Sequence, residues 1–205
     1  LASLELRLVP PTRENFERAI ELGRVAVRMA PREVTPYSYL GGAFREAGRH
    51  EEAIAALEAG LQFDPNFTQC YSEIAVCYLA LGRAREAIAS AETVLELNPR
   101  EPTNHWMYYV IAGAHFLAGD YEQAMIGAKR VSLNRPEFGR PALIWAAAAA
   151  ALDRKEEATS AVAHCLSLFP AIRVGSLAPG YITRFVRDED QLRFEALLRK
   201  AGLPE

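Results

Sequence analysis

The feature that most constrains this chain is a block of residues that recurs at a nearly constant interval. Each copy begins with alanine and ends with proline, as in "AIAALEAGLQFDP" at 53–65. Successive prolines are 34, 34, 37 and 34 residues apart, and they are Pro31, Pro65, Pro99, Pro136 and Pro170. A period in this range is typical of chains built from stacked helix pairs, in which each repeat packs only against its neighbours.

Small residues recur at two positions in each repeat and predict close contact between two antiparallel helices. They are Gly41, Ala75, Ala112 and Ala146 on the first helices, and Ala53, Ala87, Ala124 and Ala158 on the second helices. Gly48, Gly82 and Gly119 fit a tight turn between the two helices, and the fifth copy has Asp153 at that position. Proline then ends each second helix because it cannot continue the helical hydrogen bonding.

The residues around the first small position follow a recognisable pattern. The second copy has Tyr37, Leu40, Gly41 and Phe44, followed by Gly48, Ala53 and Pro65. This pattern resembles the tetratricopeptide repeat, W-x2-L-G-x2-Y, and the resemblance covers about residues 12–170. It implies an all-α, right-handed superhelical solenoid of antiparallel helix pairs with a C-terminal capping helix.

We expect one repeat domain over residues 1–205, with segments outside the repeat pattern at both ends. We expect an N-terminal extension and half repeat at 1–31, with Thr12 capping a helix that runs to about Ala30. Four repeats and a C-terminal cap follow, at 34–67, 68–101, 105–138, 139–172 and 173–205. The segment "RDEDQLRFEALLRKAGLPE" predicts an amphipathic last helix that ends at Gly202.

The composition argues against nucleic-acid and membrane partners. The net charge is −3 and no basic stripe is present, whereas nucleic-acid binding relies on clustered cations. The longest apolar run around the alanines, Ala142–Leu152, is too short for a membrane span of about 20 residues. Three cysteines without a CxxC pattern suit a reducing compartment, so we expect a cytoplasmic location.

No combination of residues predicts catalysis. The four histidines, His50, His105, His115 and His164, lie in different repeats, and no phosphate-binding loop follows a predicted strand. We therefore expect a chain that is not an enzyme and has no cofactor and no metal site.

A partner-binding groove is implied by the tetratricopeptide resemblance, because first helices of that family line a concave face. In this register the groove is polar in the N-terminal repeats and apolar in the C-terminal repeats. Its expected lining is Arg45, Gln69, Ser72, Val76, Leu79, Trp106, Tyr109, Phe116, Arg140 and Leu143. A protein or peptide partner is one possible occupant of the apolar part.

Three other interpretations of the groove stay open. The chain's own C-terminal segment, 177–203, fills it through Leu192, Leu197, Leu198 and Phe194, or a second copy of the chain covers it in a homodimer. Alternatively, the groove takes a small ligand and the domain acts as a ligand-responsive regulatory module.

Six alanines at 146–151 favour the interpretation in which the chain fills its own groove. They form part of "LIWAAAAAALDRKEEA" and predict a helix without large side chains on its groove face or its core face. Because packed proteins fill such missing volume, we expect the C-terminal segment to pack closely there.

The tail "LLRKAGLPE" resembles the C-terminal ends of bacterial multidomain proteins. In those proteins a class III adenylate cyclase domain or a winged-helix domain precedes a tetratricopeptide array. This resemblance implies a regulatory or scaffolding part of a larger bacterial signalling protein.

Overall fold

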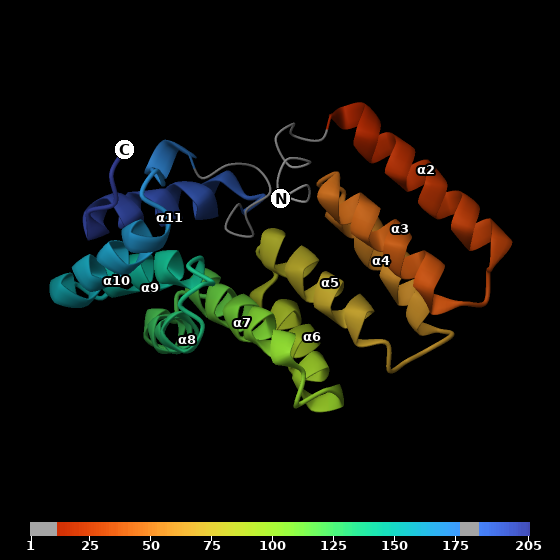
Figure 1. Cartoon of the computed structure of the whole chain (residues 1–205), viewed down its shortest axis with the longest axis horizontal. Helices are drawn as coiled ribbons and strands as arrows, with labels where there is room; N and C mark the ends of the chain where they lie inside the picture. The colour runs from red at the N-terminus through yellow and green to blue at the C-terminus, as the bar shows by residue number, and fades with distance from the viewer. Residues whose placement is uncertain (1–11, 177–184) are drawn as a thin grey trace. The chain divides into compact units, whose positions relative to one another are not determined.

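The structure, a computed structural model, describes residues 12–176 and 185–205 (Figure 1). Within these ranges the chain is all-α, with ten α-helices and two short 3-10 helices and no strand. The predicted extension at 1–11 and the stretch 177–184 of the predicted cap lie outside the described residues. The chain divides into two compact units, Leu1–Glu73 and Ile74–Glu205.

The first unit contains three helices and the start of a fourth. Thr12 begins the first of them through a capping box with Asn15, as the sequence predicts. The helices are α2 (Arg13–Met29), α3 (Val34–Glu46), α4 (His50–Leu61) and the first half of α5 (Thr68–Ala80). Helix α3 packs against both α2 and α4. A β-carbon at Gly41 would overlap the Leu57 side chain, which explains why the first helix needs a small residue there.

The second unit continues the same alternation of antiparallel helices. Its elements are the end of α5, α6 (Ala84–Leu97), η1 (Pro102–Asn104), α7 (His105–Leu117), α8 (Tyr121–Asn134), α9 (Pro141–Ala151), α10 (Lys155–Leu168), η2 (Val174–Ser176) and α11 (Asp188–Ala201). Each helix from α6 to α10 packs against the next one along the chain, and α11 packs mainly against α9. The spacing of Pro99 and Pro136 is three residues longer than the others, and η1 lies in the connection between α6 and α7 that begins this longer interval.

The turns inside the helix pairs have the backbone conformation that the sequence predicts. Gly48, Gly82 and Gly119 have φ angles of 75°, 75° and 82°, in the left-handed region that glycine adopts without strain. Asp153 takes the same conformation in the last pair, with φ of 58°. Helix α11 ends at Gly202, whose φ is 94°, as expected for a glycine C-cap.

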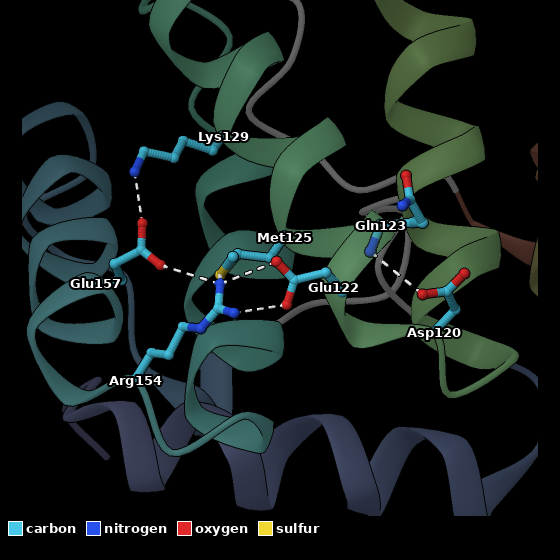
Figure 2. A network of polar contacts seen from close by, with 7 residues as sticks. All are labelled: Asp120, Glu122, Gln123, Met125, Lys129, Arg154 and Glu157. Atoms are coloured by element: carbon cyan, nitrogen blue, oxygen red, sulfur yellow. Dashed lines mark hydrogen bonds and ion pairs between the residues drawn. The ribbon is translucent and has the colours of Figure 1, made fainter.

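A network of polar contacts joins the second helices of the last two repeats (Figure 2). Arg154, just before α10, binds Glu122 of α8 with Nη2–Oε2 and Nη1–Oε1 distances of 2.7 and 3.1 Å. Glu157 of α10 accepts from Lys129 of α8 at 2.5 Å. In the first unit Arg49, just before α4, is 3.5 Å from Glu17 of α2. An arginine before a second helix therefore reaches back to the preceding second helix in both units.

No described helix is long and apolar enough to cross a membrane.

Candidate functional site

The groove face of α3 is open at Gly42. Apart from its two chain neighbours and the backbone of its own helix, no described residue lies within 4 Å of the position that a β-carbon at Gly42 would occupy. Gly113 holds the equivalent position in α7, and there a β-carbon would be 3.2 Å from Leu79 and 3.4 Å from Ile144. The two glycines thus have different surroundings, because only Gly113 is packed inside its unit.

Arg45 lies one turn after Gly42 on the same side of α3 and belongs to a polar network. It binds Glu73 of α5, and Glu73 also accepts a 2.9 Å hydrogen bond from the Gln69 side chain. Burial disfavours the charge on Arg45, but the nearby Glu73 and Glu46 carboxylates outweigh this effect and raise the pKa of Arg45. The guanidinium is therefore fixed in its charged form next to the open position at Gly42.

Ser72 completes this polar surface on α5. Its hydroxyl donates to the Thr68 carbonyl at 3.0 Å, and the residue is half-buried. We call Gly42, Arg45, Gln69, Ser72 and Glu73 the α3–α5 surface. Val76, predicted to line the groove as well, lies one turn further along α5 and is also half-buried.

The apolar part of the predicted groove is not an exposed surface, which corrects the expectation from the sequence. Leu79, Tyr109, Phe116 and Leu143 are all 1 % exposed or less. Burial raises the pKa of Tyr109, and its hydroxyl has no hydrogen-bond partner among the described residues. These four side chains belong to the core of the second unit, where a partner cannot reach them without displacing part of the chain.

The C-terminal segment is what covers Phe116. The Phe116 ring meets the edge of Phe194 from α11 at 5.3 Å between centroids and stacks on Phe185 at 6.4 Å. The guanidinium of Arg193 lies 5.6 Å from the same ring. The interpretation in which the chain fills its own groove therefore agrees with the packing of the described residues.

Polar contacts hold the start of α11 in place. The backbone N–H of Val186 donates to the Ala80 carbonyl at 2.8 Å, and Arg193 donates to the Leu117 carbonyl at 3.1 Å. Asp190 is buried and forms ion pairs with Arg187 and Arg193 at 3.3 and 3.0 Å. Because a buried carboxylate needs such partners, these contacts fix the position of α11 as well as its direction.

Of the four side chains expected to fill the groove, only two are fully buried. Phe194 and Leu198 are 0 % exposed, Leu197 is half-buried, and Leu192 is 64 % exposed on the opposite side of α11. The part of the predicted segment over 177–184 lies outside the described residues. Phe185, which precedes α11, was not predicted, because no helical periodicity marks a single aromatic residue in a connecting segment.

Trp106 and Arg140 lie together at the start of α7, in an aromatic cluster. The Arg140 guanidinium is 5.5 Å from the Trp106 ring, and Phe138 lies 4.4 Å from Trp106 and 5.4 Å from Tyr109. Trp106 and Arg140 are half-buried, so Phe138 and Trp106 together cover Tyr109. Sequence reasoning missed Phe138, which follows Pro136 in the connection between α8 and α9.

Comparisons with known proteins agree with this architecture. Residues 44–102 match the tetratricopeptide repeat family model. A search of curated protein sequences finds no match.

Three similar solved structures have low sequence identity to the chain. PilW, a type IV pilus biogenesis factor, is 14 % identical, with a TM-score of 0.72, covering 92 % of this chain and 83 % of its own. YrrB, described as having an unusual peptide-binding site, is 17 % identical, with a TM-score of 0.60 and coverage of 89 % and 92 %. MamA from Desulfovibrio magneticus RS-1 is 17 % identical, with a TM-score of 0.63 and coverage of 78 % and 88 %. The predicted fold class, an all-α array of tetratricopeptide-type helix pairs, is confirmed.

Proposed function

We propose that this chain is a non-catalytic protein-interaction module that binds an extended segment of a partner protein on the α3–α5 surface. The observation that carries the proposal is the open space beside Gly42, next to a charged arginine held in a polar network. The family-model match over 44–102 and the peptide-binding site named for YrrB support the general class of function.

The chemistry of the α3–α5 surface suits a peptide main chain. Arg45 and Gln69 have N–H groups beyond those bonded to Glu73 and Glu46, and peptide carbonyl oxygens are acceptors. The Ser72 hydroxyl donates to the Thr68 carbonyl, so its oxygen can accept from a peptide N–H. Gly42 has no side chain, so a peptide backbone can approach α3 closely at that point. Binding here is expected to depend on hydrogen bonds rather than on a large apolar area, since Leu79, Tyr109, Phe116 and Leu143 of the predicted groove are buried within the second unit.

The test blocks the surface without disturbing the core. Peptides are first selected on the wild-type protein from a displayed random library, and their affinities are measured by fluorescence anisotropy. Gly42→Trp should fill the open space and abolish binding, and Arg45→Ala should weaken it. Ala55→Trp, an exposed change on α4, is the matched control. Selected peptides that all bind these variants and wild type equally would contradict the proposal.

Two further predictions, on location and on the larger protein, are part of this proposal. That the chain is cytoplasmic, and that it forms the regulatory part of a bacterial signalling protein such as a nucleotide cyclase, rests on composition and on the short tail resemblance. None of the three proteins compared above is described as a cyclase. The gene sequence upstream of Leu1 tests the cyclase prediction directly: it either encodes a cyclase or winged-helix domain or it does not.

The alternative predicted from the sequence is that a second copy of the chain covers the apolar part of the groove in a homodimer. The observation against it is that Phe116 and Leu143 are already buried within one chain. Light scattering at increasing protein concentration distinguishes a monomer from a dimer.

A further inference from the structure

We propose a second binding site, in a hollow between α7, α8 and the segment 99–104. The geometry points to a partner segment that carries a carboxylate side chain next to an aliphatic or aromatic one. The hollow has a volume of about 500 Å³ and shares no residue with the α3–α5 surface. The inference is therefore independent of the proposed function and can fail separately from it.

The floor of the hollow is apolar and accessible. Tyr108 is 46 % exposed and Ile126 is 49 % exposed, although both are large apolar side chains on a folded surface. Gly127, next to Ile126 in α8, also lines the hollow and has no side chain where α8 faces Ala112. Accessible apolar groups inside a concavity are characteristic of binding sites.

The rim of the hollow is basic. Arg100, Arg130 and Arg135 line it, whereas Glu101 is its only carboxylate among the described residues. Arg135 is paired with Glu137 at 3.5 Å and donates to the Pro102 carbonyl. Arg100 and Arg130 form no ion pair with a described residue, and the Arg130 guanidinium lies 6.0 Å from the Tyr108 ring. On a chain with net charge −3, this local positive charge favours an acidic ligand.

The length of the hollow favours a peptide over a small anion. Its lining runs from Asn104, the residue before α7, along that helix to His115, and along α8 from Gln123 to Asn134. Eleven helical steps span roughly 16 Å, which matches about five residues of extended chain. An acidic side chain can then reach Arg130 while a neighbouring apolar side chain lies over Ile126 and Tyr108.

Peptide selection on the intact protein, followed by charge reversal, tests the inference. Affinities of the selected peptides are measured for wild type, Arg130→Glu, Arg100→Glu and Ile126→Glu. We expect one class of peptides with an acidic residue beside an apolar one, whose affinity falls about tenfold or more in each variant. Arg32→Glu, an exposed change in the first unit with the same charge difference, is the control and should leave binding unchanged.

The α3–α5 surface serves as the internal reference. Peptides of the acidic class should keep their affinity for Gly42→Trp, since Gly42 does not line the hollow. Two results would overturn the inference: no selected peptide is sensitive to Arg130→Glu, or the sensitive peptides lack an acidic residue. Circular dichroism of each variant, with an unchanged helical signal, ensures that a loss of binding reports on the hollow.

Discussion

At the scale of single residues, Asp153 occupies a turn position at which the other repeats have glycine. The first three complete repeats place glycine at the left-handed turn position, and the last places Asp153 there. Aspartate is among the few other residues that tolerate this conformation, at a cost of about 1 kcal/mol. The Lys200 ammonium hydrogen-bonds to its carboxylate at 2.7 Å and lowers the pKa of Asp153, but both groups are exposed, so the pair contributes little to stability.

Asp153→Gly should therefore be more stable than Asp153→Ala. The difference is expected to be about 1 kcal/mol, because alanine has a β-carbon in an unfavourable backbone region and glycine does not. Urea unfolding measures it. At the exposed helical position Ala55 the order should reverse, with Ala55→Gly less stable than wild type, because glycine is unfavourable inside a helix. Equal stability of the two Asp153 variants would mean that the turn is not strained.

The buried cysteines give a pH dependence at high pH. Burial raises the pKa of the Cys70 thiol to about 11, and burial likewise raises the pKa of the Cys165 thiol to about 11. In the unfolded chain thiols ionise near pH 8.5. The unfolded state therefore loses protons first, and the free energy of unfolding should fall between about pH 9 and pH 11, by about 1.4 kcal/mol per pH unit for each thiol.

Urea unfolding at pH 8 and pH 10.5 checks this expectation. Cys165→Ala should lose less stability over that interval than wild type does. If the variant and wild type lose the same amount, Cys165 is not the group that titrates.

At the scale of the helices, α9 explains the run of six alanines. Residues from Pro141 to Ala150 are all buried, and α7, α8, α10 and α11 each pack against this helix. A helix surrounded by neighbours needs small side chains, because each of them must approach its axis closely. The alanine-rich helix α9 is therefore a surface on which α11 and the neighbouring helices pack, and it is not part of an open groove.

Ala147→Leu should destabilise the protein by about 1–3 kcal/mol through overpacking. Ala147 is 0 % exposed on α9, whereas Ala55→Leu on α4 adds the same atoms at an exposed position and should change stability little. Thermal unfolding of the two variants makes the comparison. Unchanged stability of Ala147→Leu would show that the α9 face is open.

The helices themselves could be predicted from the sequence, because the 34-residue period fixes where each pair begins and turns. The turn glycines, the Thr12 cap and the end of α11 at Gly202 were all readable from local patterns. Which groove residues are exposed could not be predicted from the sequence. The repeat register tells which residues share a face, but Phe116 is buried by Phe185 and Phe194, which lie outside the repeat pattern.

At the scale of the whole chain, the structure separates a polar surface that is open from an apolar surface that the chain covers itself. The α3–α5 surface belongs to the first unit, and the packing of α11 on α9 belongs to the second unit. Sequence position within the repeat is the same for Gly42, Gly113 and Ala147, so only tertiary packing distinguishes them. The proposed function depends on this difference in access.

Thiol labelling of Gly42→Cys and Ala147→Cys tests that difference most directly. The native cysteines are buried and should react slowly, which gives a low background. We predict that Gly42→Cys reacts with a maleimide in the native state nearly as fast as a free thiol, and that Ala147→Cys reacts only when the protein unfolds. Native-state labelling of Ala147→Cys as fast as that of Gly42→Cys would contradict the account, and so would protection of Gly42→Cys.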